Sequence, residues 1–172
     1  ALKQQFPGLQ IRQSGQGREQ SKDLGVLGRL TLIAILIIFA LMASQLKSYS
    51  QPLIILAGVP FGAAGALVGH YLLGFNLSFI SIFGIVALSG VVVNDALVLV
   101  DRYNKLVEEG WDNAEAIVEA SRRRFRAIFL TTATTALGLA PMLLETSTSA
   151  QFLIPMAVSL ATGIIFASVI IL

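Results

Sequence analysis

The chain has 172 residues, of which 55% are apolar and only 13% are charged, and its formal net charge is +2. Soluble domains average about 45–50% apolar and about 25% charged residues. The composition therefore excludes an ordinary cytosolic enzyme, a disordered chain and a nucleic-acid-binding module. The sequence contains no cysteine and only one histidine, His70. Disulfides, thiolate sites and histidine-rich metal sites are thereby excluded, and we expect neither a metal nor a cofactor.

The first element is a polar lead, residues 1–23, which lacks the pattern of a cleavable signal peptide. It is too short to form a core, so we interpret it as the end of a folded domain that lies upstream. The chain starts at Ala1 and stops inside an apolar run at Leu172. We therefore expect it to be a piece of a larger membrane protein.

Five apolar runs follow the lead, and their lengths predict five membrane-spanning helices, because a span needs about 20 apolar residues. Buried strands of a soluble α/β protein would need turn signals every few residues. The predicted fold class is therefore an all-α membrane protein with a bundle of five transmembrane helices. The runs cover residues 24–46, 52–73, 76–100, 127–144 and 151–172.

The second run carries small residues at helical spacing. Gly58 and Gly62, and likewise Gly65 and Gly69, form pairs four residues apart that allow two helices to approach closely. Pro60 predicts a kink in this run. We interpret the glycines as packing residues without chemistry.

The third run contains Asp95, a carboxylate well inside an apolar stretch. Such a charge costs at least about 2.5–3.5 kcal/mol and normally marks an ion or proton path. Asn94 beside it supplies a neutral donor and acceptor. Asp95 is thus the main functional candidate, and the alternative is that it only cross-links helices through hydrogen bonds.

The insert at residues 102–126 is the one soluble-looking segment between runs. Gly110 is expected to end one helix, and Asp112 with Glu115 resembles a capping box that starts another. We predict a short cytoplasmic amphipathic helix with one face on membrane lipid. The insert also holds most of the loop arginines and lysines, which places it in the cytoplasm by the positive-inside rule and the N-terminal segment on the outside.

The fourth run begins after a basic stretch and carries a cluster of hydroxyl groups. Arg124 and Thr131 lie seven residues apart and share a helix face. Threonines in spanning helices often bond only to their own backbone, but a cluster favours at least one that faces a polar interior. Its members are Thr131, Thr132, Thr134 and Thr135.

Three motifs in this order resemble the C-terminal transmembrane half of resistance–nodulation–division (RND) efflux transporters. VPFGAAGALVG is similar to the family's ninth spanning helix, GVVVNDALVLVD to its tenth, and RRRFRAIFLTTATTALGLAPM to its eleventh. The resemblance covers nearly the whole chain and implies that residues 1–23 end a periplasmic porter domain. Residues 24–172 would then be helices eight to twelve.

The resemblance implies a secondary active transporter, not an enzyme, that exports small molecules in exchange for protons. It implies a bacterial inner-membrane protein that works as a homotrimer with a periplasmic adaptor and an outer-membrane channel, and that needs the N-terminal half of its own chain. No nucleotide-binding loop G-x-x-x-x-G-K-[ST] is present, which favours an ion gradient over ATP. The implied proton pathway comprises Asp95, Asn94, Thr131 and Arg124.

One position departs from the family pattern. The drug-pump branch has a lysine where Asn94 stands here, so Asp95 is expected to join a carboxylate cluster whose charge is balanced from elsewhere.

Two other functions stay open: an RND-like protein-translocation accessory or lipid exporter, and a structural membrane scaffold whose polar residues only join helices.

Overall fold

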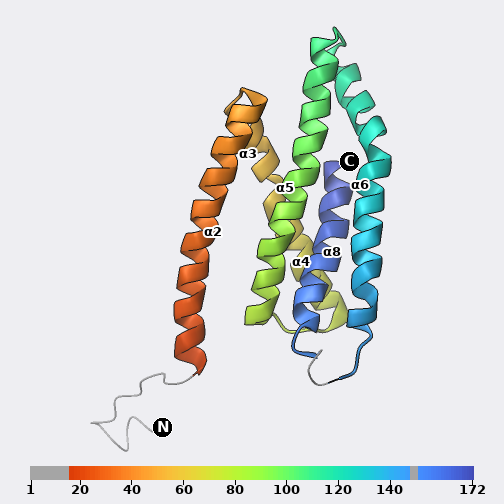
Figure 1. Ribbon diagram of the computed structural model, residues 1–172. Coiled ribbons are helices and arrows are strands. Elements are labelled where there is room, and N and C mark those ends of the chain that lie inside the picture. The colour runs from red at the N-terminus through yellow and green to blue at the C-terminus, as the bar shows by residue number, and fades with distance from the viewer. Residues whose placement is uncertain (1–15, 148–150) are drawn as a thin grey trace, which may run out of the picture. The chain divides into compact units, whose positions relative to one another are not determined.

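The computed structural model describes residues 16–147 and 151–172, with the side chains of residues 16–21 left out of that description. The expectation that the lead ends a folded domain therefore falls largely on residues outside the described part. All described elements are helices (Figure 1): α2 Gln16–Leu46, α3 Ser50–Leu56, α4 Gly58–Leu73, α5 Phe79–Glu108, α6 Asn113–Leu143 and α8 Ile154–Ile171.

The all-α membrane fold is confirmed. Within the described residues, five stretches are long and apolar enough to cross a membrane, and α3 and α4 together form one of them. The chain divides into two compact units, residues 1–37 and 38–172. In the first unit, large apolar side chains of α2 such as Leu30 and Leu36 are more than half exposed, as suits a surface that meets lipid.

Helix α8 lies at the centre of the second unit and contacts α4, α5 and α6 (Figure 1). It can do so because its buried face is rich in small residues, among them Ala157, Ala161, Gly163 and Ala167. Close approach of helices with small interface residues is what holds membrane bundles together. The core on this face joins Leu88 and Val92 of α5 to Ile164 and Ala167 of α8.

The four glycines of α4 lie against neighbouring helices. A methyl group on Gly62 would lie 3.3 Å from the side chains of Leu88 and Val92. On Gly65 it would collide with Phe166 of α8, and on Gly69 with Thr162 of α8. Gly58 would meet Val92 at 3.3 Å. At Gly65 and Gly69 side-chain atoms of α8 occupy the space of a Cβ, whereas at Gly58 and Gly62 the side chains of α5 would be in tight contact with it.

The second span differs from the predicted single helix 52–73. It consists of α3 and α4, with a break at Ala57. Pro60 is the physical reason, because it has no N–H to donate to the carbonyl of Leu56 and its ring crowds that carbonyl. The amide of Ala57 still finds a partner, the carbonyl of Leu53 at 3.0 Å.

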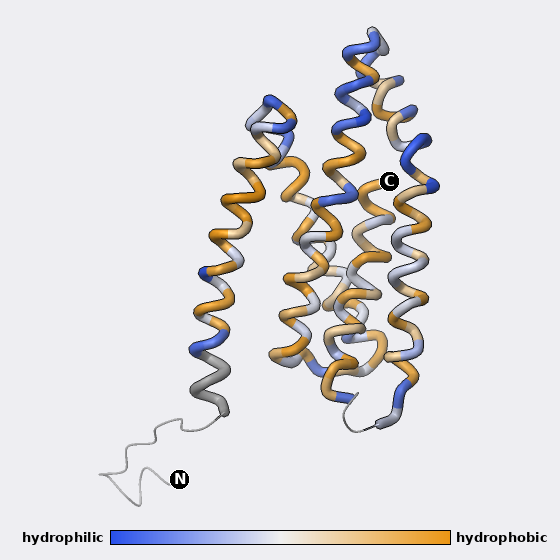
Figure 2. Tube along the Cα trace, in the orientation of Figure 1, coloured by the Kyte–Doolittle hydropathy of each residue, from blue (hydrophilic) through white to orange (hydrophobic). Residues whose placement is uncertain are grey.

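The insert also differs from the expected short separate helix. α5 continues to Glu108, and α6 runs without interruption from Asn113 into the fourth span. Gly110 adopts a φ of +93° at the turn, as its predicted helix-ending role requires. Asp112 is the N-cap, and its carboxylate accepts from the amide of Ala114 at 3.1 Å. Figure 2 shows that both helices are hydrophilic near the turn that joins them and more hydrophobic away from it.

Candidate functional site

Asp95 is buried in the middle part of α5, with 7% of its surface exposed. Its neighbours Val92, Val93 and Ala96 are buried as well. Among the described residues it is the only acidic side chain in the buried set. An ionised carboxylate in such an apolar stretch costs free energy unless it is paired or hydrated. A carboxylate is a group that can take up and release a proton, and this chemistry is open to Asp95.

Asn94 lies next to Asp95 in the chain but points elsewhere. Successive residues of an α-helix are rotated by about 100°, and the side chain of Asn94 is exposed while that of Asp95 is buried. Within the described part of the chain, no hydrogen bond joins the two side chains. The exposed side chain of Asn94 can therefore contact a neighbouring segment, and it points away from the side chain of Asp95.

Thr131 and Arg124 lie on α6 and have no hydrogen bond or ion pair with Asp95 in the described residues. The hydroxyl of Thr131 donates to the carbonyl of Ala127 at 2.9 Å, and its side chain is exposed. Arg124 is half-buried. The two share one face of α6, as their spacing predicts, and the structure leaves Thr131 on the outside of the bundle.

Thr132 makes the interhelical contact of the hydroxyl cluster. Its Oγ1 lies 2.6 Å from the Oγ of Ser168 on α8. Thr134 and Thr135 bond back to carbonyls of α6 at 2.8 Å each. Sequence reasoning found the cluster but did not single out Thr132, because the partner Ser168 comes from a helix 36 residues away.

A buried polar network at one end of α4 was not predicted. His70 is 2% exposed, and its Nε2 lies 2.9 Å from the hydroxyl of Ser81 at the start of α5. Ser159 of α8 donates to the carbonyl of Ser81 at 3.0 Å. The spacing Ser78-x-x-Ser81, which forms a capping box in the structure, is the one sequence signal that could have indicated this network.

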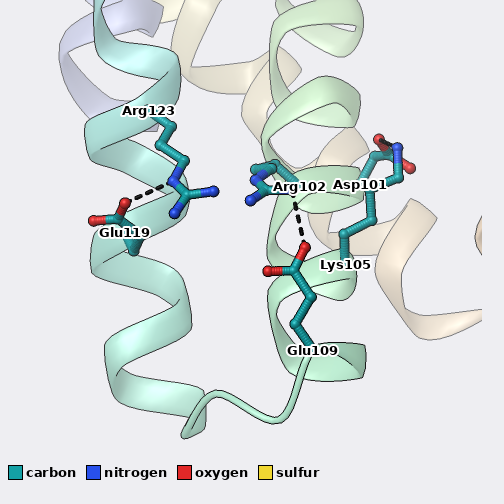
Figure 3. Close-up of polar contacts among 6 residues, drawn as sticks. All are labelled: Asp101, Arg102, Lys105, Glu109, Glu119 and Arg123. Carbon is teal, nitrogen blue, oxygen red and sulfur yellow. Dashed lines mark hydrogen bonds and ion pairs between the residues drawn. The ribbon is translucent and has the colours of Figure 1, made fainter.

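Polar contacts also gather where α5 and α6 meet (Figure 3). Asp101 pairs with Lys105 at 2.7 Å and Arg102 with Glu109 at 3.4 Å. Arg123 pairs with Glu119 of its own helix at 2.6 Å. Exposed pairs of this kind contribute about 0–1 kcal/mol each. They mark the hydrophilic end of the bundle rather than a reactive centre.

The opposite turn, after α6, carries one acid. The backbone amides of Ser147 and Thr146 each donate to Glu145 at 3.0 Å. These hydrogen bonds, the one from Ser147 foremost, lower the pKa of Glu145. Glu145 therefore stays ionised to a lower pH than an ordinary glutamate.

The comparisons with known proteins point to one group. The model of the AcrB/AcrD/AcrF family matches residues 1–172. The chain is 33% identical over 136 residues to the swarming motility protein SwrC of Bacillus subtilis (strain 168), which covers 79% of this chain and 13% of that protein. It is 32% identical over 144 residues to the multidrug resistance protein MdtC of Proteus mirabilis (strain HI4320), covering 83% and 14%.

Solved structures show the same fold. Two crystal forms of a heavy metal efflux pump superpose with TM-scores of 0.84 and 0.83 at 28% identity. The superposition covers 95% and 94% of this chain and 16% of the pump in each case. The chain thus spans about one seventh of the length of its relatives.

Proposed function

The chain belongs to the AcrB/AcrD/AcrF family of RND efflux permeases, and from this we propose that it forms five helices of the transmembrane module of a proton-driven exporter. The exported compounds would be small molecules that leave across the bacterial inner membrane. The relatives support this proposal, since MdtC is named for multidrug resistance and the solved structures are of a heavy metal efflux pump.

The burial of Asp95 carries the proposal. A buried carboxylate in the apolar part of a spanning helix is costly when charged, so it must be paired, hydrated or protonated. When Asp95 takes up a proton, the charge disappears and the packing of α5 against its neighbours is favoured. When it releases the proton, the helix must expose the carboxylate to water or to a cation. This alternation couples a proton gradient to helix movement.

Asn94, Thr131 and Arg124 are proposed to act with Asp95 once the rest of the transporter is in place. Asn94 and Thr131 are exposed on the bundle surface, which gives another transmembrane segment access to them. Arg124, at the polar end of the same face of α6, would supply positive charge near the carboxylate pathway. The hydroxyl of Thr131 can switch from the carbonyl of Ala127 to a proton donor or acceptor on that segment.

The surroundings of the module are also proposals. The basic residues at the α5–α6 end favour a cytoplasmic location for that end, which would place the start of α2 on the periplasmic side. By family membership we propose a homotrimer that joins a periplasmic adaptor and an outer-membrane channel. Energy would come from the proton gradient.

The test replaces Asp95 by Asn in the full-length protein, with Asp101→Asn as the matched control. Asp101 is an acid of the same helix, but it lies at the polar end and pairs with Lys105. Substrate efflux is measured in proteoliposomes with and without an imposed pH gradient, after size-exclusion chromatography shows that each variant is folded.

We expect Asp95→Asn to abolish the response to the pH gradient and Asp101→Asn to keep most of it. An Asp95→Asn variant that still exports with the normal dependence on the gradient would contradict the role of Asp95. The polar residues would then serve only to join helices, as in the scaffold alternative.

A further inference from the structure

A groove of about 630 Å³ runs along the surface between α6 and α8. Its size lies in the range of about 300–1,000 Å³ that is typical of small-molecule sites. Eight of the ten residues that line the groove are apolar, and the hydroxyls of the other two, Thr132 and Ser168, bond to each other at 2.6 Å. The main wall residues are Phe125, Phe129, Ala136, Leu137, Ile165 and Val169.

Two arginines of α6 neighbour the groove residues in the sequence, although neither belongs to the groove lining. Arg122 and Arg126 precede Phe129 by seven and three residues, so they share the groove face of α6. Both side chains are exposed. Arg122 lies 3.8 Å from Glu119, but that carboxylate is engaged at 2.6 Å by Arg123 (Figure 3). Arg126 has no ion pair within the described residues.

The site therefore combines an apolar trough with cations at the point where α6 changes from hydrophilic to hydrophobic (Figure 2). An arginine guanidinium binds phosphate oxygens in a bidentate manner. A water-soluble anion would pair with the arginines but make no contact with the apolar walls. An apolar helix would contact the walls but leave the arginines without a partner. An amphiphile with a phosphate and a long hydrocarbon chain satisfies both parts.

We propose that this groove binds an anionic phospholipid of the surrounding bilayer. One acyl chain lies between α6 and α8, in contact with Phe129 and Val169. The phosphate accepts hydrogen bonds from Arg126 and Arg122 at the membrane boundary. The proposal concerns the lipid-facing surface and does not depend on the transport role of Asp95.

The experiment uses the full-length protein with the photoreactive amino acid benzoylphenylalanine in place of Phe129. The protein is reconstituted in nanodiscs of phosphatidylglycerol or of phosphatidylcholine, illuminated, and analysed by mass spectrometry. The same labelling is repeated with Arg122→Ala plus Arg126→Ala. Lys105→Ala is the control, since Lys105 is an exposed cation at the same end of the bundle that pairs with Asp101.

We expect a lipid adduct that forms preferentially with phosphatidylglycerol. A basic side chain near an anionic lipid surface contributes about a five-fold gain in binding, so the double variant should reduce this adduct at least about ten-fold. Lys105→Ala should leave it unchanged. If the double variant does not fold, the single change Arg126→Gln should still lower the adduct about five-fold.

Three results would overturn the proposal. One is an adduct to a peptide from elsewhere in the protein, which would show that the groove is an internal interface. Another is equal labelling by the two lipids. The third is an adduct that Arg122→Ala plus Arg126→Ala leaves as strong as in the parent protein.

Discussion

The imidazole Nε2 of His70 lies 2.9 Å from the hydroxyl oxygen of Ser81, across the turn that joins α4 to α5. The other ring nitrogen of His70 lies 2.9 Å from the carbonyl oxygen of Ala66. Ser159 bonds to the backbone of the same Ser81, so one network joins three helices. In an apolar surrounding each of these polar groups needs its partner. This end of the bundle is therefore held by hydrogen bonds as well as by packing.

Replacing His70 by Ala should destabilise the protein by about 1–3 kcal/mol, because buried hydrogen-bonding groups lose their partner. Thermal unfolding of the full-length protein in detergent measures the effect. Tyr71→Ala is the control, since the neighbouring side chain is 87% exposed. Equal losses in the two variants would mean that the network contributes nothing beyond local helix propensity.

Gly65→Ala and Gly69→Ala should each destabilise the protein by about 1–3 kcal/mol, because the new methyl group must displace Phe166 or Thr162 of α8. Gly90→Ala is the matched control on α5, where a methyl group meets nothing within 4 Å. That variant should be neutral or stabilising by about 0.5–1 kcal/mol, as alanine is the better helix former. If thermal unfolding shows Gly65→Ala and Gly69→Ala to be as stable as Gly90→Ala, the close packing of α4 on α8 is contradicted.

Thr131→Val and Thr132→Val should affect different properties. Thr132 bonds to Ser168 across helices, so its replacement should lower stability by about 1 kcal/mol or more. Thr131 bonds only within α6, so its replacement should leave stability nearly unchanged while it reduces proton-coupled efflux. Unfolding and transport are measured on the same preparations. A Thr131→Val variant with full efflux would remove Thr131 from the proposed pathway.

Gln51 and Asn104 exchange two amide hydrogen bonds, at 2.7 and 2.8 Å, that join α3 to α5. A double-mutant cycle with Gln51→Ala and Asn104→Ala should give a coupling free energy of about 0.5–3 kcal/mol. The measurement is the unfolding free energy of the two single variants and of the double variant. Additive losses would show that the pair does not act as a unit.

Much of the fold was predictable from run lengths. Apolar stretches of about 20 residues admit few structures other than spanning helices, and Gly110 and Asp112 marked the end of α5 and the start of α6. The break at Ala57 was harder to locate. A proline predicts that a helix is kinked or broken nearby. The break lies one turn before Pro60, because the carbonyl of Leu56 has no N–H donor there.

For the candidate site, the sequence predicted positions within single helices but not the contacts between helices. Depth within an apolar run singled out Asp95, and helical spacing put Arg124 and Thr131 on one face. Periodicity along one helix does not say which other helix meets that face. For this reason the Thr132–Ser168 contact and the burial of His70 were missed, and the assembly of the proton pathway stays a prediction.

The uninterrupted course of α6 has a mechanical consequence. With 31 residues at about 1.5 Å each, the helix is about 46 Å long, well beyond the roughly 30 Å of a bilayer core. The one proline inside the helix, Pro141, lies in its last turn, so the residues before it tilt together as a rigid rod. A tilt of about 5° about its midpoint shifts both ends by about 2 Å in opposite directions. A movement imposed near Thr131 therefore also shifts the loop between α5 and α6, which ends at Asp112.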